Sequence, residues 1–304
     1  MADGSHIEPF QRARPQLKGL AYRMLGSFSD AEDIVQDAWI RWQSVDQGKI
    51  ECPDAFLRKV VTRLCLDELK SAKRRREEYV GPWLPEPATD DRLAHEGMGH
   101  LAEDITIAFL LALEKLSPAE RAVLLLHDVF ATPFQEISGI LGRSEAACRQ
   151  TAVRARKRLR SDRIHLTADR DHAQRMADAF IAAVRAGDMA AIEQVLSDDV
   201  KVHTDGGGIR PAAINVIKGK GKAVRLFLGL RRQFGGSYPH IVSKGMFNGS
   251  PGFVSRDADG EPQITILEPG SGGRIAAIYV VRNPEKLASL QEMPSGDQSA
   301  RCAI

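Results

Sequence analysis

The hydrophobic period of this sequence changes partway along the chain. Up to about residue 163, apolar residues recur at intervals of three and four, as over 10–25, which is typical of amphipathic helices. After about residue 170, two more helices are predicted, at 172–186 and 189–197, before alternating, β-branched segments begin. Strands are expected at 200–204, 241–247, 263–267 and 274–281, with a helix at 222–233 among them. Helices followed by a mostly antiparallel sheet indicate an all-α part and then an α+β part.

Capping residues predict where several helices begin. We expect Ser29 to cap a helix over 29–44, with Glu32 completing a capping box. Ser117, followed by Pro118 and then Glu120, predicts the same arrangement for a later helix.

The segment after Thr132 has the pattern of a helix-turn-helix. Thr132-Pro133 repeats the start signal, the short helix that follows should end at Gly142, and Ser144 caps a longer helix to about Arg160. At about 100° per residue, one side of the longer helix is apolar. The opposite side and the turn form a candidate DNA surface made of Arg143, Ser144, Ala146, Arg149, Gln150, Val153, Arg154 and Lys157. Arg and Gln near a helix N-terminus can reach base edges, and later cations suit phosphates. A solvated basic helix is the alternative.

The helix expected from Pro53 to about Arg76 carries a second basic face. Its members are Lys59, Arg63, Lys70, Lys73 and Arg74. The cations at 73–76 also suit the helix C-terminal dipole, but four in a row exceed what a cap needs. Two separated basic helices predict contacts at two DNA positions.

The helix over 29–44 has an acidic face opposite its apolar one. This face consists of Asp33, Gln36, Asp37 and the exposed aliphatic Ile40. A solvated face is the default for such a pattern. Because carboxylates repel DNA, the face also suits a basic protein partner.

Composition limits the classes of protein that remain. The 304 residues suit two or three domains, and a net charge of +2 identifies no partner. Residues 77–104 hold eight carboxylates against one arginine among several Pro and Gly, which predicts an acidic linker. No apolar run approaches the roughly 18 residues of a membrane span, and the N-terminus lacks the pattern of a secretion signal. The four cysteines lack metal-ligand spacing. We therefore expect a cytoplasmic protein that needs no metal and no cofactor and does not contact a membrane.

These segments resemble a known family. Residues 29–39 (SDAEDIVQDAW) resemble region 2 of bacterial extracytoplasmic-function (ECF) sigma factors, where this helix docks on the RNA polymerase clamp. Residues 56–76 resemble the part of region 2 that melts and reads the −10 element. Residues 116–121 (LSPAER) and the helix-turn-helix behind them resemble region 4, which reads the −35 element. Arg63 stands where many relatives carry Asn, so a generic −10 specificity does not transfer.

Two further motifs resemble the sigma-J-like subgroup, whose members carry a fused C-terminal SnoaL-like (NTF2-like) cone. They are the linker at 79–87 (YVGPWLPEP) and the tail motif at 283–287 (NPEKL), and Asp205 begins a matching Asp-Gly-rich motif. The resemblance implies that the fused domain regulates the sigma factor by contacting it. The implied regulatory residues are Trp83, Asp205, Gly206, Asn283, Pro284, Lys286 and Leu287.

The resemblance implies a multidomain protein with two all-α sigma domains and an α+β cone. The expected domains are region 2 at 7–76, the linker at 77–104, region 4 at 105–163, the SnoaL-like domain at 170–290 and a flexible tail at 291–304. The expected partners are core RNA polymerase and the −35 and −10 elements of promoter DNA. The implied function is promoter-specific transcription initiation, with no catalytic residue.

Two alternatives stay open at this point. A ligand-sensing helix-turn-helix regulator would bind promoter DNA alone and would not need the acidic helix face. A DNA-tethered enzyme of the SnoaL class would use His203 and Asp205, which lie two apart on an expected strand and so share one face. Asp205 before three glycines also fits a turn in which its carboxylate bonds its own backbone.

Overall fold

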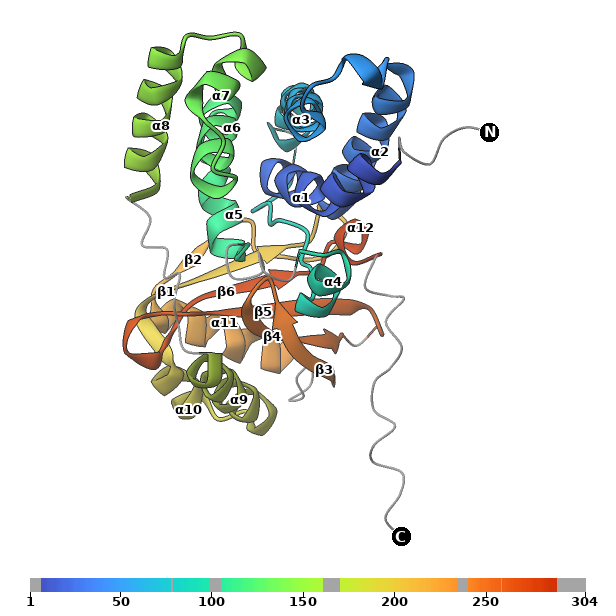
Figure 1. Ribbon diagram of the computed structural model, residues 1–304. Coiled ribbons are helices and arrows are strands. Elements are labelled where there is room, and N and C mark those ends of the chain that lie inside the picture. The colour runs from blue at the N-terminus through green and yellow to red at the C-terminus, as the bar shows by residue number, and fades with distance from the viewer. Residues whose placement is uncertain are drawn as a thin grey trace. The chain divides into compact units, whose positions relative to one another are not determined.

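The computed structural model describes residues 7–77, 79–98, 105–160, 170–233, 240–257 and 259–288 (Figure 1). The described residues form two compact units. The first unit holds the chain up to the linker together with residues from Asp91 to the end of the helix-turn-helix. The second unit holds the described residues from 170 on and also Tyr79–Asp90, so this part of the predicted linker belongs with the C-terminal unit. The expected tail at 291–304 lies outside the described residues.

The first unit is all helical, as the sequence predicted. Its helices are α1 (Glu8–Leu25), α2 (Phe28–Ser44), α3 (Pro53–Glu77), α4 (Asp90–His95), α5 (Ile107–Leu113), α6 (Pro118–Leu124), α7 (Phe134–Leu141) and α8 (Glu145–Arg160), with a short 3-10 helix η2 (Gln47–Lys49) and a π-helix η4 (Leu125–Val129). Helix α1 packs on both α2 and α3, and α8 packs on α6 and α7 (Figure 1). Large apolar side chains such as Tyr22, Phe28 and Trp42 fill the spaces between the first three helices and are buried.

The start of α2 corrects the expected capping box. Ser27, not Ser29, is the N-cap, and its hydroxyl accepts a hydrogen bond from the backbone N–H of Asp30 at 3.2 Å. Glu32 instead accepts from the ammonium of Lys18 at 2.7 Å, and this bond lowers the pKa of Glu32. The Lys18 side chain is only 1% exposed, so its charge requires a nearby carboxylate. A tertiary ion pair therefore takes the carboxylate that the local pattern assigned to a cap.

The other start signals have mixed outcomes. The capping box of Ser117 and Glu120 is present in both directions and is confirmed. Gly142 ends α7 with a φ of 64°, and the Ser144 hydroxyl accepts from a backbone N–H in the first turn of α8, both as predicted. The Thr132 prediction is wrong, because α7 has Pro133 at its N-cap and no side-chain cap.

The second unit is α+β, as predicted. Its elements are α9 (Arg170–Ala186), α10 (Met189–Val195), β1 (Leu196–Asp205), β2 (Ile217–Lys218), α11 (Lys220–Gln233), β3 (His240–Phe247), β4 (Ser250–Arg256), β5 (Pro262–Pro269), η5 (Ser271–Gly273), β6 (Ile275–Val281) and α12 (Pro284–Leu287). The strand order is β2-β1-β6-β5-β4-β3. Neighbouring strands are antiparallel except for β1 and β6, which are parallel.

Strand β4 is the main element that the sequence did not predict. Pro251 and Gly252 interrupt the alternating pattern there, so the segment resembles a loop. In the sheet, a Cβ on Gly252 would lie 2.5 Å from the carbonyl oxygen of Thr265 on β5. The glycine is therefore required by close packing of the two strands and does not interrupt the sheet.

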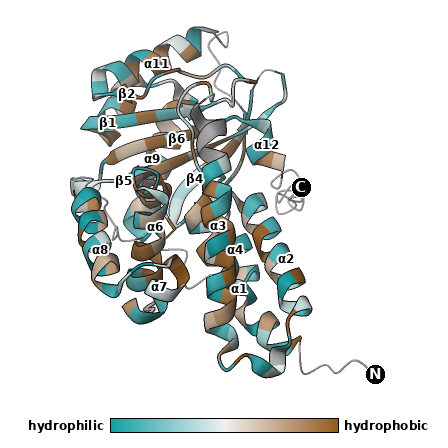
Figure 2. Cartoon of the chain, turned by 90° about the horizontal axis from the view of Figure 1, so that it is seen from above, coloured by the Kyte–Doolittle hydropathy of each residue, from teal (hydrophilic) through white to brown (hydrophobic). Residues whose placement is uncertain are grey.

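The sheet is covered on both faces. Val202 pairs with Ile278 and packs against α9 and α11 in the main core, together with residues such as Phe180. Alternate residues such as Tyr279 point to the opposite face and are also buried. Strand β6 is accordingly coloured hydrophobic along most of its length in Figure 2. On the face that the helices leave open, Asp205 at the end of β1 contacts Tyr79 and Leu84 of the linker.

Candidate functional site

The predicted −35 surface forms one exposed face of α8 and its preceding turn. All eight predicted residues, from Arg143 to Lys157, are exposed, and Val153 is 62% exposed although it is aliphatic. On the other side of the helix, Cys148, Ala152 and Ala155 are buried. Figure 2 shows this helix largely in the hydrophilic colour. The structure thus brings the predicted residues together on one surface.

Two other cations of the same helix have structural partners. Arg156 forms an ion pair with Asp128, and Arg158 lies 2.6 Å from the Glu120 carboxylate of the capping box. These pairs fasten α8 to the preceding helices. The basic run of α8 therefore divides into cations on the candidate DNA face and cations that hold the helix in place.

The predicted −10 residues on α3 are in less uniform surroundings. Arg63 and Lys70 are exposed and Lys59 is half-buried, while the side chains of Lys73 and Arg74 lie outside the described residues. Lys70 pairs with Asp67 at 2.8 Å.

Arg63 also contacts the helix-turn-helix. Its guanidinium donates to the carbonyl oxygens of Ile140 at 3.1 Å and Gly139 at 3.4 Å, near the C-terminal end of α7. One turn earlier on α3, Arg58 makes a two-bond pair with the Glu136 carboxylate at 3.1 and 3.3 Å. In this arrangement one residue of the candidate −10 face, Arg63, binds the first helix of the helix-turn-helix while remaining exposed.

The predicted acidic face of α2 is exposed. Asp33, Gln36, Asp37 and Ile40 all lie on the surface, and Ile40 is 57% exposed. The intervening Ile34, Val35 and Ala38 are buried against the neighbouring helices. The helix thus presents carboxylates and one aliphatic side chain together, a combination suited to a basic and partly apolar partner.

In the second unit, Asp205 is the centre of a polar cluster on the sheet face that the helices leave open. Its side chain is fully buried. The carboxylate accepts hydrogen bonds from the Tyr79 hydroxyl at 2.5 Å, the Leu84 backbone N–H at 2.8 Å and the Lys286 ammonium at 2.7 Å. Burial and the neighbouring Asp205 carboxylate raise the pKa of Tyr79, so its phenol stays protonated and can donate. Asp205 is therefore the residue that anchors the linker to the sheet, as Tyr79 and Leu84 both belong to the linker.

The tail motif completes this cluster, which we call the linker site. Lys286 on α12 also donates to the Leu84 carbonyl at 2.5 Å, and its ammonium lies 4.4 Å from the centre of the Trp83 ring. The Asn283 side-chain amide donates to the Tyr79 hydroxyl at 3.0 Å, and its carbonyl caps the short helix that Pro284 begins. Leu287 is buried at the end of that helix. The predicted regulatory residues, from Trp83 on the linker to Leu287, therefore come together.

Glycines after Asp205 are needed for this geometry. A Cβ on Gly206 would lie 2.0 Å from the carbonyl oxygen of Arg210, and one on Gly207 would lie 2.5 Å from the Asn283 side chain. Gly207 also has a φ of 65°, and its N–H donates to the Asp205 carboxylate at 3.0 Å. The turn that the sequence predicted is thus confirmed, and it lets Asn283 approach the backbone.

A second contact holds the other end of the linker, and the sequence prediction missed it. The Asn248 side-chain carbonyl accepts from the Ala88 N–H at 2.9 Å, and the Asn248 N–H donates to the Ala88 carbonyl at 2.9 Å. Asn248 has a φ of 51° in the β3–β4 turn with Gly249, a pair typical of two-residue hairpins. The Asn-Gly pair could have identified this hairpin, but nothing local connects it with the linker.

His203 and Asp205 do share one sheet face, as expected. In register, His203 stands opposite Tyr279 of β6, and the centres of their rings are 5.3 Å apart. The Asp205 carboxylate, however, is bound by the linker and by Lys286. The site is thus built to hold the linker, which disfavours a role for Asp205 as a catalytic base.

Comparison with known proteins places the chain in a family. Residues 10–75 match the Sigma-70 region 2 model and residues 106–159 match the Sigma-70, region 4 model. The ECF RNA polymerase sigma factor SigJ of Mycobacterium tuberculosis is 38% identical over 290 residues, which cover 92% of each chain. The probable ECF sigma factor SigI of the same organism is 35% identical over 194 residues, 63% of this chain and 67% of SigI.

A solved structure agrees over nearly the whole chain. The crystal structure of M. tuberculosis SigJ matches with a TM-score of 0.74 at 35% identity, covering 93% of this chain and 98% of SigJ. In the part of the chain that the structure describes, no helix is long and apolar enough to cross a membrane. With both sigma regions in order and with SigJ matched along nearly its full length, the chain belongs to the ECF sigma factors of RNA polymerase.

Proposed function

We propose that this chain recruits core RNA polymerase to promoters through three surfaces, and that its C-terminal domain regulates the process through the linker. The exposed face of α8 reads the −35 element, the basic face of α3 contacts the −10 element, and the acidic face of α2 docks on the polymerase. The protein then works in the cytoplasm, with polymerase and DNA. The chain itself catalyses no reaction in this proposal.

The observation that carries the DNA assignment is the division of α8 into two faces. Arg149 and Gln150 lie near the helix N-terminus and are exposed, which suits hydrogen bonds to base edges. Lys157 lies two turns later and suits a phosphate. Arg149 is held by Glu145 at 2.5 Å and lies over the Phe134 ring, so its position is supported from two sides. These contacts support a fixed reading residue more than a freely solvated cation.

The contacts between α3 and α7 bear on how the two DNA surfaces are used. Reading two separated promoter elements requires the two sigma regions to separate. In the structure, Arg58 and Arg63 both bind α7, and the buried Arg121 donates to the Met24 carbonyl of α1. We infer that this is a closed arrangement, and that it opens when the chain joins polymerase and promoter.

The linker site supports a regulatory role for the C-terminal domain. Four residues of the predicted set make contacts there, Trp83, Asp205, Asn283 and Lys286, and the linker is the segment that joins the two sigma regions. When residues 79–90 are bound to the sheet, a shorter part of the linker is free to extend between the two sigma regions on the promoter. The domain can thereby set how far the two regions separate.

A transcription experiment with matched variants tests the proposal. Run-off transcription by purified core polymerase should depend on this chain, and Arg149→Ala should relax sequence preference at one or two −35 positions by about 1–3 kcal/mol. Lys157→Ala should weaken all sequences alike and flatten the salt dependence. Arg185→Ala, which removes an exposed cation from α9, is the control and should change neither.

A polymerase-binding experiment tests the acidic face separately. Asp33→Arg/Asp37→Arg places cations where a basic partner is expected and should weaken core association without unfolding the chain. Core affinity that stays the same would remove the docking assignment. Promoter binding without polymerase would favour the ligand-sensing regulator.

A further inference from the structure

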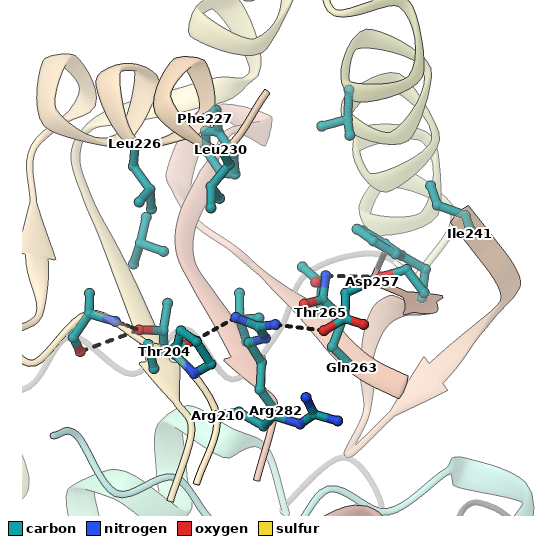
Figure 3. Close-up of a pocket in the computed structure, with 18 of the residues that line it drawn as sticks. Thr204, Arg210, Leu226, Phe227, Leu230, Ile241, Asp257, Gln263, Thr265 and Arg282 are labelled. Carbon is teal, nitrogen blue, oxygen red and sulfur yellow. Dashed lines mark hydrogen bonds and ion pairs between the residues drawn. The ribbon is translucent and has the colours of Figure 1, made fainter. Parts of the chain in front are cut away.

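The C-terminal unit contains a cavity of about 360 Å³ between its sheet and the helices α9 and α11 (Figure 3). This volume falls within the range of small-molecule sites. The cavity lies on the face of the sheet opposite the linker site, because Thr204 lines it while the neighbouring Asp205 binds the linker. The linker contacts therefore do not account for it.

One end of the cavity is apolar. Leu226, Phe227 and Leu230 of α11 line this end, as Figure 3 shows, and Phe180 contributes from α9. Sheet residues such as Val202, Val280 and Phe253 extend the apolar wall. A ligand that enters must therefore have an apolar body, since a polar one would lose its hydration here without gaining partners.

The other end is polar but has balanced charges. The Arg282 guanidinium lies 2.8 Å from the Asp257 carboxylate, whose side chain is only 6% exposed, and it also donates to the Pro211 carbonyl. The Arg210 guanidinium lies 2.6 Å from the Glu261 carboxylate. Both cations thus already have anionic partners, and a negatively charged ligand would compete with them.

One further carboxylate of the lining, that of Asp259, is 79% exposed and lies 3.9 Å from the Arg210 guanidinium. The remaining polar side chains of the lining are neutral. They are the hydroxyls of Thr204, Ser255 and Thr265 and the amide of Gln263. Hydroxyl and amide groups can form hydrogen bonds with the uncharged hydroxyl or carbonyl groups of a ligand. We propose that this cavity binds an uncharged, mainly apolar small molecule that carries a hydroxyl or carbonyl group.

Bound ligand would act directly on the linker site, because both sites use neighbouring residues of the same two segments. Thr204 and Arg282 line the cavity, and the adjacent Asp205 and Asn283 bind the linker. The backbone N–H groups of Arg282 and Asn283 donate to the Asp205 carbonyl at 2.7 and 3.0 Å. Arg282 lines the cavity, whereas Asn283 holds Tyr79 of the linker. A ligand that displaces Arg282 therefore also moves Asn283, the next residue in the chain, which binds Tyr79 of the linker. The ligand site and the regulated contact are coupled through this strand end.

A neutral fluorescent probe tests the site in the full chain. The probe is 6-propionyl-2-(dimethylamino)naphthalene, an uncharged apolar molecule with one carbonyl group. We expect saturable binding of one probe per chain, with a blue shift in emission. Leu230→Trp fills the cavity and should weaken binding about tenfold or more. Leu228→Trp places the same group on α11 outside the cavity lining and should leave binding unchanged, with circular dichroism to confirm that both variants fold. Equal affinity for both variants would overturn the proposed site.

A charged probe tests the class of ligand. 6-(dimethylamino)naphthalene-2-sulfonate should bind about tenfold more weakly than the neutral probe. Asp257→Asn frees Arg282 from its carboxylate partner and should narrow this difference. Tighter binding of the sulfonate by the unaltered chain would show that the site takes anions instead.

Hydrogen exchange tests the coupling to the linker site. Saturating neutral probe should change the exchange rate of the Leu84 amide about threefold or more, and should not do so in Leu230→Trp. An unchanged rate with the cavity occupied would refute the coupling. None of these readouts requires transcription, so their failure would leave the sigma-factor assignment unaffected.

Discussion

The linker site makes a quantitative prediction about Asp205. Asp205→Ala removes the acceptor of four hydrogen bonds at once, from the Tyr79 hydroxyl, the N–H groups of Leu84 and Gly207, and the Lys286 ammonium. The Lys286 side chain is only 12% exposed. Removing one partner from a buried ion pair typically costs about 3–5 kcal/mol. Because the linker can detach without unfolding the sheet, we expect this cost to appear as a loss of linker attachment of about 3 kcal/mol, or roughly a hundredfold in the attached-to-detached ratio.

Amide hydrogen exchange measures this ratio at the residue concerned. The Leu84 amide should lose about a hundredfold in protection in Asp205→Ala, while amides in the middle of β6 keep theirs. Asp198→Ala is the matched control, because Asp198 also lies on β1 and pairs with a lysine, Lys220, but its side chain is 81% exposed. Protection of Leu84 that changes by less than about threefold in Asp205→Ala, or equally in both variants, would refute the reasoning.

Other variants test other parts of the structure. Arg58→Glu should weaken the closed arrangement of the two sigma regions by about 1 kcal/mol, because the two-bond pair of Arg58 with Glu136 is about a quarter exposed on each side. Adding Glu136→Arg should restore the closed arrangement. Spin-label distances between the two regions measure the opening, and a double variant that stays open would show that this ion pair does not hold them together. Burial raises the pKa of Glu268 to about 7, so the folded state keeps a proton that the unfolded state releases, and the free energy of unfolding should fall by about 3 kcal/mol from pH 5 to 8 in denaturant titrations. Glu268→Gln should abolish that fall, and a fall that persists would implicate another group. Ending the chain before Asn283 should change promoter-dependent transcription, whereas His203→Ala should leave it unchanged. Loss of activity in a folded His203→Ala variant would instead favour a ligand-binding or catalytic pocket at His203.

The sequence by itself determined much of the local structure. The capping box at Ser117, the glycine end of α7 and the two faces of α8 follow from hydrogen bonds and spacing within one or two turns of helix. Such features need no information about the rest of the chain, and for this reason they could be predicted. The same applies to the turn after Asp205, where consecutive glycines permit a positive φ.

Only the tertiary structure determined which partners some polar side chains bind. Glu32 does not cap its own helix, because its carboxylate pairs with the Lys18 ammonium. A buried charge without a partner costs more free energy than an uncapped helix end that water can reach. The Asn248 contact with Ala88 joins residues 160 apart, a pairing that no local pattern specifies.

The linker shows the same division. Its acidic, Pro-containing composition predicted a linker, and its motif resembled a regulatory one. Its attachment to Asp205 depends on a strand end, a glycine turn and α12, which are far apart in sequence and meet only when the sheet forms. Local interactions are specified by neighbouring residues, whereas a buried charge takes the partner that the completed fold brings within reach.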